Sequence, residues 1–243
     1  MADVRELMKD YLDYLEIEKN RSPKTRENYE RYLIRFITHQ KIKDLKDLTL
    51  DSIKDFRLAL AREKDLKKVT QSYYVIAIRN FLKYLVKKDY DVVAPDKIEL
   101  PKIAQRQIEL VEFADLDRLL AAPDTATIRG MRDKAILELF FSTGLRLSEL
   151  CSLNRYLNFD RGELTIRGKG EKLRLVFVSD GARKSLKTYL DKRGDTLENL
   201  FVSLDKSNKV IGKITPRAVQ RLVSTYAQKA GITRRLTPHG LRH

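Results

Sequence analysis

Three short segments in the second half of the chain carry side chains that can act on a phosphate group. In the first, residues 142–150 (STGLRLSEL), Gly144 ends one helix and presents Arg146 at the start of the next. The planar guanidinium of an arginine there can contact two phosphate oxygens at once, helped by the helix N-terminal amides. Glu149, three residues further on, is placed to hold that guanidinium in position.

The other two segments add a lysine, a histidine and a second arginine. Residues 167–174 (RGKGEKLR) put Lys169 on a glycine-flanked hairpin tip, from which its amine can reach into a groove. Residues 237–243 (TPHGLRH) hold His239 and Arg242 three apart, so the start of a helix puts both on one face. Each motif alone is weak, because a turn lysine or a histidine near an arginine is common by chance. Their order along one chain is specific.

The charge of the chain predicts a polyanionic partner. The 243 residues include 49 Lys and Arg against 34 Asp and Glu, a formal net charge of +15. Residues 66–88 hold six basic and no acidic residues, and residues 206–243 hold nine and none. Two stretches of one sign suggest two surfaces that grip one nucleic acid. The alternatives are a basic protein of thermophilic type, or helices that pack against acidic segments elsewhere in the chain.

Apolar periodicity predicts a mainly α protein with a small antiparallel sheet (α+β). Residues 1–98 are predicted to form a helical domain, residues 99–109 an interdomain linker, and residues 110–243 a mixed domain. The predicted helices of the first domain lie at 4–15, after Ser22-Pro23, after Thr49 and at 69–87. The second domain is predicted to have helices at 114–121, 129–142, 148–153 and 181–190, strands at 162–167, 173–178 and 200–202, and helices opened by Thr215-Pro216 and by Pro238.

Several residues are predicted to have ordinary structural roles. Cys151 lies in an apolar run and is expected to be a small buried hydrophobe, and His39 a surface residue near a helix end. No apolar run approaches the about 20 residues that span a bilayer, so we expect a cytoplasmic protein without a membrane partner. The histidines are only three, and no carboxylate cluster has metal-ligand spacing, so no metal or other cofactor is expected.

In order and spacing, TGLRLSEL, RGKGEKLR and TPHGLRH resemble the motifs of the tyrosine recombinase, or phage integrase, family, closest to its Xer-type branch, which includes archaeal Xer-like enzymes. The resemblance covers essentially the whole chain. It implies a helical, SAM-like core-binding domain and a catalytic domain that form a C-shaped clamp around double-stranded DNA. It also implies a homotetramer on DNA, and site-specific cleavage and rejoining through a 3′-phosphotyrosine. Chromosome dimer resolution, phage integration and cassette exchange remain alternatives.

The resemblance also implies a role for each motif residue. Arg146 and Arg242 would clamp the non-bridging oxygens of the scissile phosphate. Lys169, with Lys172 as its rival, would be the general acid for the departing 5′ oxygen, and His239 would assist proton movement at the nucleophile. The supporting residues would be Glu149 and His243. The residues expected to bind DNA are Lys67, Lys68, Gln71, Lys172, Arg174, Arg217 and Arg221.

The sequence departs from the family at the nucleophile. All eleven tyrosines precede Pro238, whereas the family has its nucleophilic tyrosine after the second arginine. Tyr226 is the nearest, but it falls on the apolar stripe of its helix, which favours a role in packing. We therefore expect a truncated chain that binds DNA without cutting it. The alternatives are an inert DNA-binding paralogue or fragment, and a type IB topoisomerase relative, which the helical first domain disfavours.

Overall fold

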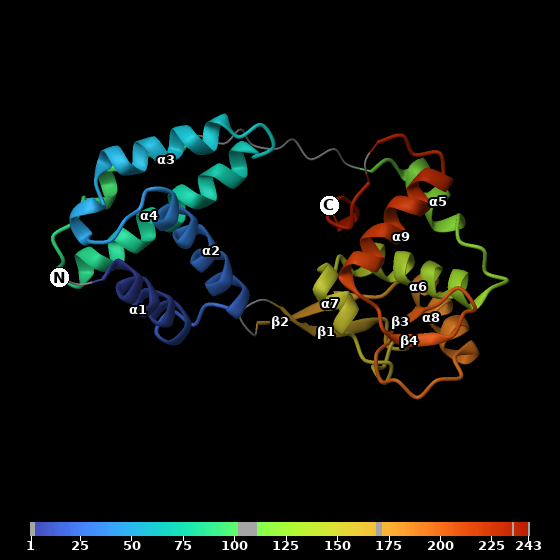
Figure 1. Cartoon of the computed structure of the whole chain (residues 1–243). Helices are drawn as coiled ribbons and strands as arrows, with labels where there is room; N and C mark the ends of the chain where they lie inside the picture. The colour runs from blue at the N-terminus through green and yellow to red at the C-terminus, as the bar shows by residue number, and fades with distance from the viewer. Residues whose placement is uncertain (1–2, 102–110, 169–171, 235, 243) are drawn as a thin grey trace. The chain divides into compact units, whose positions relative to one another are not determined.

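The structure is a computed structural model that describes residues 3–101, 111–168, 172–234 and 236–242, without the side chain of Arg242. The chain divides into two compact units, Met1–Gln105 and Arg106–His243 (Figure 1). Most of the predicted linker, residues 99–109, falls outside the described residues. Nothing in the described part of the chain is a helix long and apolar enough to cross a membrane.

The first unit is helical, as predicted. Its elements are α1 (Val4–Ile17), α2 (Pro23–His39), the 3₁₀ turn η1 (Leu45–Asp47), α3 (Leu50–Arg62), α4 (Lys68–Lys87) and the 3₁₀ turn η2 (Pro95–Lys97). The start of α2 follows the predicted cap, because the Ser22 hydroxyl accepts a hydrogen bond from the Thr25 amide at 3.3 Å. Helix α4 packs against α1, α2 and α3, and its inner face, which includes Phe81 and Leu82, is fully buried.

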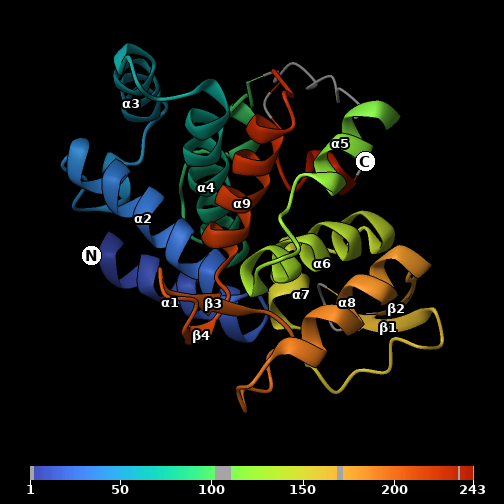
Figure 2. The same ribbon diagram turned by 90° about the vertical axis from the view of Figure 1, so that its right-hand side faces the viewer.

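The second unit combines five helices of the described chain with two small sheets. The helices are α5 (Phe113–Ala121), α6 (Ile128–Thr143), α7 (Leu147–Ser152), α8 (Asp180–Lys192) and α9 (Pro216–Lys229), and the strands are β1 (Glu163–Arg167), β2 (Leu173–Phe177), β3 (Val202–Leu204) and β4 (Val210–Lys213). Helix α6 packs against α8 and is buried on most sides (Figure 2). The helices predicted at 114–121, 129–142, 148–153 and 181–190 are confirmed to within two residues at each end, and α9 begins at Pro216 as predicted.

The strands of the described residues form two antiparallel hairpins. The first joins the two strands that the sequence predicts, and in it Glu163 pairs with Phe177 and Arg167 with Leu173. The second hairpin differs from the prediction: its first strand starts at Val202, not at residue 200, and its partner β4 is not predicted at all. Strand β4 contains Gly212 at φ 133° and no alternating buried side chain, so it lacks the pattern by which a strand is recognised.

A buried polar network joins α6, α9 and β3. Arg132 and Asp133 are both buried, and Arg132 donates to the Asp133 carboxylate at 2.6 and 2.8 Å and to the Val202 carbonyl at 2.9 Å. The hydroxyl of Tyr226 donates to the other carboxylate oxygen of Asp133 at 3.0 Å. Burial and the neighbouring Asp133 raise the pKa of Tyr226. The predicted packing role of Tyr226 is confirmed.

The last described segment is shorter than the predicted helix. A single 3₁₀ turn, η4, spans Gly240–Arg242. Thr237 starts it, because its hydroxyl accepts a hydrogen bond from the Gly240 amide at 3.2 Å and its carbonyl accepts one from the Leu241 amide at 3.1 Å. His239 therefore lies in the turn before η4 and not on a common helix face with Arg242.

Candidate active site

Arg146 lies at a sharp junction between two helices. Gly144 ends α6 in the left-handed conformation, at φ 55° and ψ 31°, which a glycine adopts without strain. Arg146 then caps α7 in an extended conformation, and the fully buried Leu145 between them fixes the connection to the core. The Arg146 side chain remains 44% exposed, so its guanidinium is accessible to a ligand.

Glu149 holds this guanidinium in place, as its spacing predicts. One carboxylate oxygen accepts from Arg146 Nη1 at 2.9 Å, and the other accepts from the Arg146 backbone amide at 2.7 Å. The Glu149 side chain is only 8% exposed. Burial raises the pKa of Glu149, but hydrogen bonds from Arg146 and Arg174 outweigh it and hold the pKa below its ordinary value. Glu149 is therefore an anion at neutral pH.

Arg174, which was predicted to contact DNA, lies against the same carboxylate. It donates from Nη2 to Glu149 Oε2 at 2.6 Å and from Nη1 to Oε1 at 3.2 Å. This two-point contact joins β2 to α7. It was not apparent from the sequence, because it depends on the register of the hairpin and not on spacing along the chain.

Gly168, which follows strand β1 and precedes Lys169, lies close to the guanidinium groups of both arginines. A Cβ atom added at Gly168 would lie 3.4 Å from Nη1 of Arg146 and of Arg174. The Gly168 amide donates to the Lys172 carbonyl at 2.8 Å, which closes the described end of the hairpin. Lys169 itself lies outside the described residues. Lys172, its rival for the role of general acid, is exposed.

A pocket of about 320 Å³ brings the first and third motifs together. Its wall includes Arg146, His239 and Gln220 of α9, and its other lining residues are Phe140, Leu145, Leu147, Thr237 and Pro238. Residues that are far apart in sequence thus meet at one cavity, whose lining combines apolar side chains with Arg146, Gln220 and His239. The backbone of Arg242 follows in η4, while its side chain and the whole of His243 lie outside the described part of the structure.

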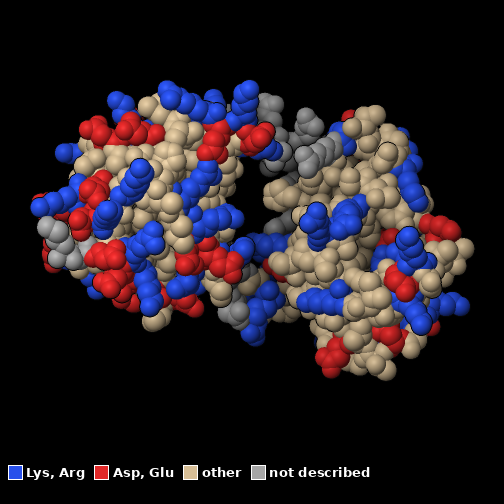
Figure 3. All heavy atoms as spheres, viewed as in Figure 1, with Lys and Arg blue, Asp and Glu red and all other residues tan. Residues whose placement is uncertain are grey.

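The other predicted DNA contacts lie on two helices. Arg217 and Arg221 are exposed on α9, on the side away from its buried residues such as Val219 and Val223. Lys67 and Lys68 are exposed at the start of α4. Gln71 is half-buried, and its side-chain amide donates to the Leu66 carbonyl at 2.9 Å. Basic side chains lie on the visible face of both units, with acidic ones among them (Figure 3).

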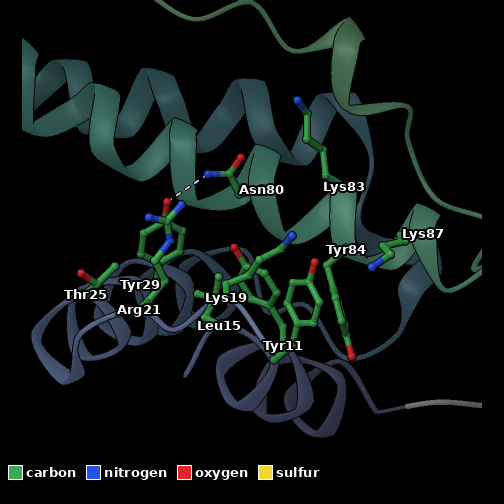
Figure 4. A pocket seen from close by; sticks show the side chains of 11 residues that line it. Tyr11, Leu15, Lys19, Arg21, Thr25, Tyr29, Asn80, Lys83, Tyr84 and Lys87 are labelled. Atoms are coloured by element: carbon green, nitrogen blue, oxygen red, sulfur yellow. Dashed lines mark hydrogen bonds between the residues drawn. The ribbon is translucent and has the colours of Figure 1, made fainter. Parts of the chain in front are cut away.

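The first unit has a pocket of its own that is lined by basic side chains, and it was not predicted from the sequence. It has a volume of about 290 Å³, and Asn80 on its wall donates to the Tyr29 hydroxyl at 2.9 Å (Figure 4). Among the residues that the structure describes, none of those lining this pocket carries a carboxylate. Its four basic residues are Lys19, Arg21, Lys83 and Lys87, and its tyrosines are Tyr11, Tyr14, Tyr29 and Tyr84. The sequence does not indicate a site at Lys19 and Arg21, because they follow the acidic end of α1.

Comparison with known proteins identifies the family. The Phage integrase family matches residues 109–243, and the Phage integrase, N-terminal SAM-like domain matches residues 8–89. The chain therefore belongs to the phage integrase family of tyrosine recombinases.

Within this family the chain is similar to Xer recombinases. It is 32% identical to Tyrosine recombinase XerC of Myxococcus xanthus, over 100% of this chain and 83% of that protein. It is 31% identical to Tyrosine recombinase XerD of Listeria monocytogenes, over 99% of this chain and 83% of that protein.

Solved structures share the fold at lower identity. The Tn1549 transposon integrase in complex with circular intermediate DNA has a TM-score of 0.75 at 17% identity, covering 100% of this chain and 85% of that one. A lambda integrase tetramer bound to a Holliday junction has a TM-score of 0.74 at 15% identity, covering 100% and 71%.

Proposed function

We propose that the protein is a site-specific DNA recombinase in which Arg146 and Arg242 hold the scissile phosphate. The observation that carries the proposal is the pocket shared by Arg146 and His239, in which Arg146 is oriented by the buried Glu149. A fixed cation at this place would neutralise the charge that builds on the non-bridging oxygens as the phosphate becomes pentavalent. The family supports Arg242 as the second cation.

Proton transfer is assigned to the hairpin and to the third motif. Lys169 would protonate the departing 5′ oxygen, and a positioned general acid is worth roughly 10²–10⁴ in rate. Its neighbour Gly168 supports this assignment, because it lies over the Arg146 guanidinium. His239 would assist proton movement at the nucleophile, and His243 would support the site.

No nucleophile is assigned among the 243 residues. Tyr226 is buried and hydrogen-bonded to Asp133, which supports a packing role, and the other ten tyrosines come earlier in the chain. We therefore propose that these residues bind DNA and do not cleave it. A catalytically inert DNA-binding protein is the second candidate function, and the same burial of Tyr226 favours it.

Both units are proposed to contact double-stranded DNA, with a homotetramer as the assembled form. On the second unit, the exposed Arg217 and Arg221 support this arrangement. On the first unit, Lys67, Lys68 and the basic pocket of Figure 4 offer donors for backbone phosphates. The lambda integrase tetramer bound to a Holliday junction, which has the same fold, supports the tetramer.

Measurements of DNA binding test whether Arg146 holds a phosphate, as the phosphate clamp of Arg146 and Arg242 requires. A preferred duplex is selected from a random pool with the purified protein, and each phosphate is then replaced in turn by a neutral methylphosphonate. We expect the dissociation constant to rise about tenfold or more where a charged hydrogen bond is lost. We call this rise in the dissociation constant the penalty of neutralising a phosphate. In Arg146→Ala the penalty should disappear at one phosphate and remain at the others. Binding that is insensitive to salt, with no phosphate dependent on Arg146, would refute the clamp.

Covalent trapping tests the recombinase. The protein as its gene encodes it, with any residues that flank these 243, is incubated with nicked duplexes that carry the selected site, and a protein–DNA adduct is expected. Specific binding without any adduct would favour the inert DNA-binding protein. Relaxation of supercoiled plasmids that lack the site would favour a topoisomerase.

A further inference from the structure

The Glu149 carboxylate is shared between two arginines in a defined way. Its Oε1 accepts from Nη1 of Arg146 and of Arg174, at 2.9 and 3.2 Å. Its Oε2 accepts from the Arg146 backbone amide at 2.7 Å and from Arg174 Nη2 at 2.6 Å. Arg174 therefore makes the two-pronged contact, whereas Arg146 gives this carboxylate a single side-chain hydrogen bond. A two-pronged contact fixes the plane of a carboxylate as well as its position.

The charge of this cluster depends on Arg174. Two guanidinium groups and one carboxylate leave a net charge of +1 beside the pocket. Without Arg174, Arg146 and Glu149 would form a neutral pair, and the buried carboxylate would compete with a phosphate for the donors of Arg146. With Arg174 in place, Arg146 keeps further N–H donors for a ligand, since a guanidinium has five.

Arg174 also connects the cluster to the hairpin. It pairs with Ile166 across the β1–β2 ladder, and its Nη1 would lie 3.4 Å from a Cβ atom at Gly168. The Arg174 side chain is only 29% exposed, which limits its access to DNA. One ion pair thus joins the strand that follows Lys169 in the sequence to the helix that Arg146 caps.

We propose that Arg174 is a positioning residue: it neutralises and orients Glu149, so that Arg146 is free to bind the scissile phosphate and the β1–β2 hairpin stays docked beside it. This inference rests on the proposed function and replaces the predicted contact of Arg174 with DNA. It assigns no step of the reaction to Arg174 itself.

The methylphosphonate scan separates positioning from direct contact. In Arg174→Met, the penalty at the phosphate that depends on Arg146 should fall from about tenfold to below about threefold. Arg174→Lys keeps the charge but not the two-pronged geometry, so it should retain an intermediate penalty. Lys187→Met, which removes an exposed lysine on α8 of the same unit, is the matched control. It should leave this penalty unchanged.

Each other outcome has a distinct meaning. If Arg174→Met loses the penalty at a different phosphate and keeps the one that depends on Arg146, Arg174 contacts DNA directly and the inference is wrong. If both Arg174 variants keep every penalty, the inference is also wrong. If the unmodified protein has no phosphate that depends on Arg146, the proposed function itself fails. Circular dichroism spectra confirm that each variant is folded, and Arg174→Lys provides the test if Arg174→Met is not.

Discussion

The change of Glu149 to glutamine tests how the Arg146 site is stabilised. The carboxylate accepts four hydrogen bonds from two arginines, and a glutamine offers a single oxygen while directing its NH₂ group at other donors. Breaking a fully buried ion pair costs about 3–5 kcal/mol. Because Arg146 is 44% exposed and Arg174 is 29% exposed, solvent compensates part of this loss. We expect the free energy of unfolding to fall by about 2–3 kcal/mol at pH 7.

The dependence on pH identifies the cause. The pKa of Glu149 is lower in the folded chain than its ordinary value of 4.5, so the ionised carboxylate stabilises the fold above pH 4.5. This stabilisation is lost as the pH falls through the folded pKa. The difference between wild type and Glu149→Gln should therefore be full at pH 7 and shrink as the medium becomes more acidic than pH 4.5.

Calorimetric unfolding of both proteins from pH 7 to pH 3 measures this difference. Glu163→Gln is the control, because Glu163 is an exposed carboxylate on β1 of the same unit, and it should change stability by less than about 0.5 kcal/mol. An equally small effect of Glu149→Gln at pH 7 would refute the reasoning. So would a large effect that does not diminish in acid, since the lost interaction would then not be ionic.

Three further predictions concern the core of the second unit. Gly130→Ala would place a Cβ atom 1.8 Å from the Asp124 carbonyl oxygen, so thermal unfolding should show a loss of about 1–3 kcal/mol or more, and an unchanged melting temperature would contradict this contact. Tyr226→Phe removes the hydrogen bond to the buried Asp133 and should cost about 1–3 kcal/mol in urea unfolding, whereas a neutral effect would show that Asp133 is satisfied by Arg132 alone. Burial raises the pKa of Cys151 from 9.0 to about 11, so the buried neutral thiol is favoured over the thiolate in the folded chain. This preference contributes about 2.7 kcal/mol to the free energy of unfolding, complete below pH 9 and lost between pH 9 and 11. Urea unfolding of Cys151→Ala under reducing conditions should show a smaller loss of stability over that range, and an equal loss would assign the effect to other groups.

Helices were predictable from the sequence because their buried residues recur at a fixed spacing. The caps at Ser22 and at Gly144 follow from residue type, and both are present. The contact of Glu149 with Arg146 follows from a spacing of three residues at a helix start, and the structure has it at 2.9 Å. The burial of Cys151 is confirmed in the same way, from its apolar neighbours.

The features that were missed depend on contacts between distant segments. Arg174 contacts Glu149 because the β1–β2 hairpin packs beside α7. An arginine in a basic segment of the sequence does not indicate such a carboxylate partner. Strand β4 has no buried side chain, and its antiparallel pairing with β3 is what defines it. The pocket of the first unit joins α1, α2 and α4, so its four basic residues become neighbours only in the folded bundle.

The length of the Glu149 side chain has a consequence for which substitutions the site can accept. Its carboxylate reaches the backbone amide and the guanidinium of Arg146, and also the guanidinium of Arg174 on another element. An aspartate there is one methylene shorter and cannot reach all three donors from the same backbone position. A negative charge alone is therefore not sufficient at position 149. The side chain must also be long enough to contact all three donors, which glutamate is and aspartate is not.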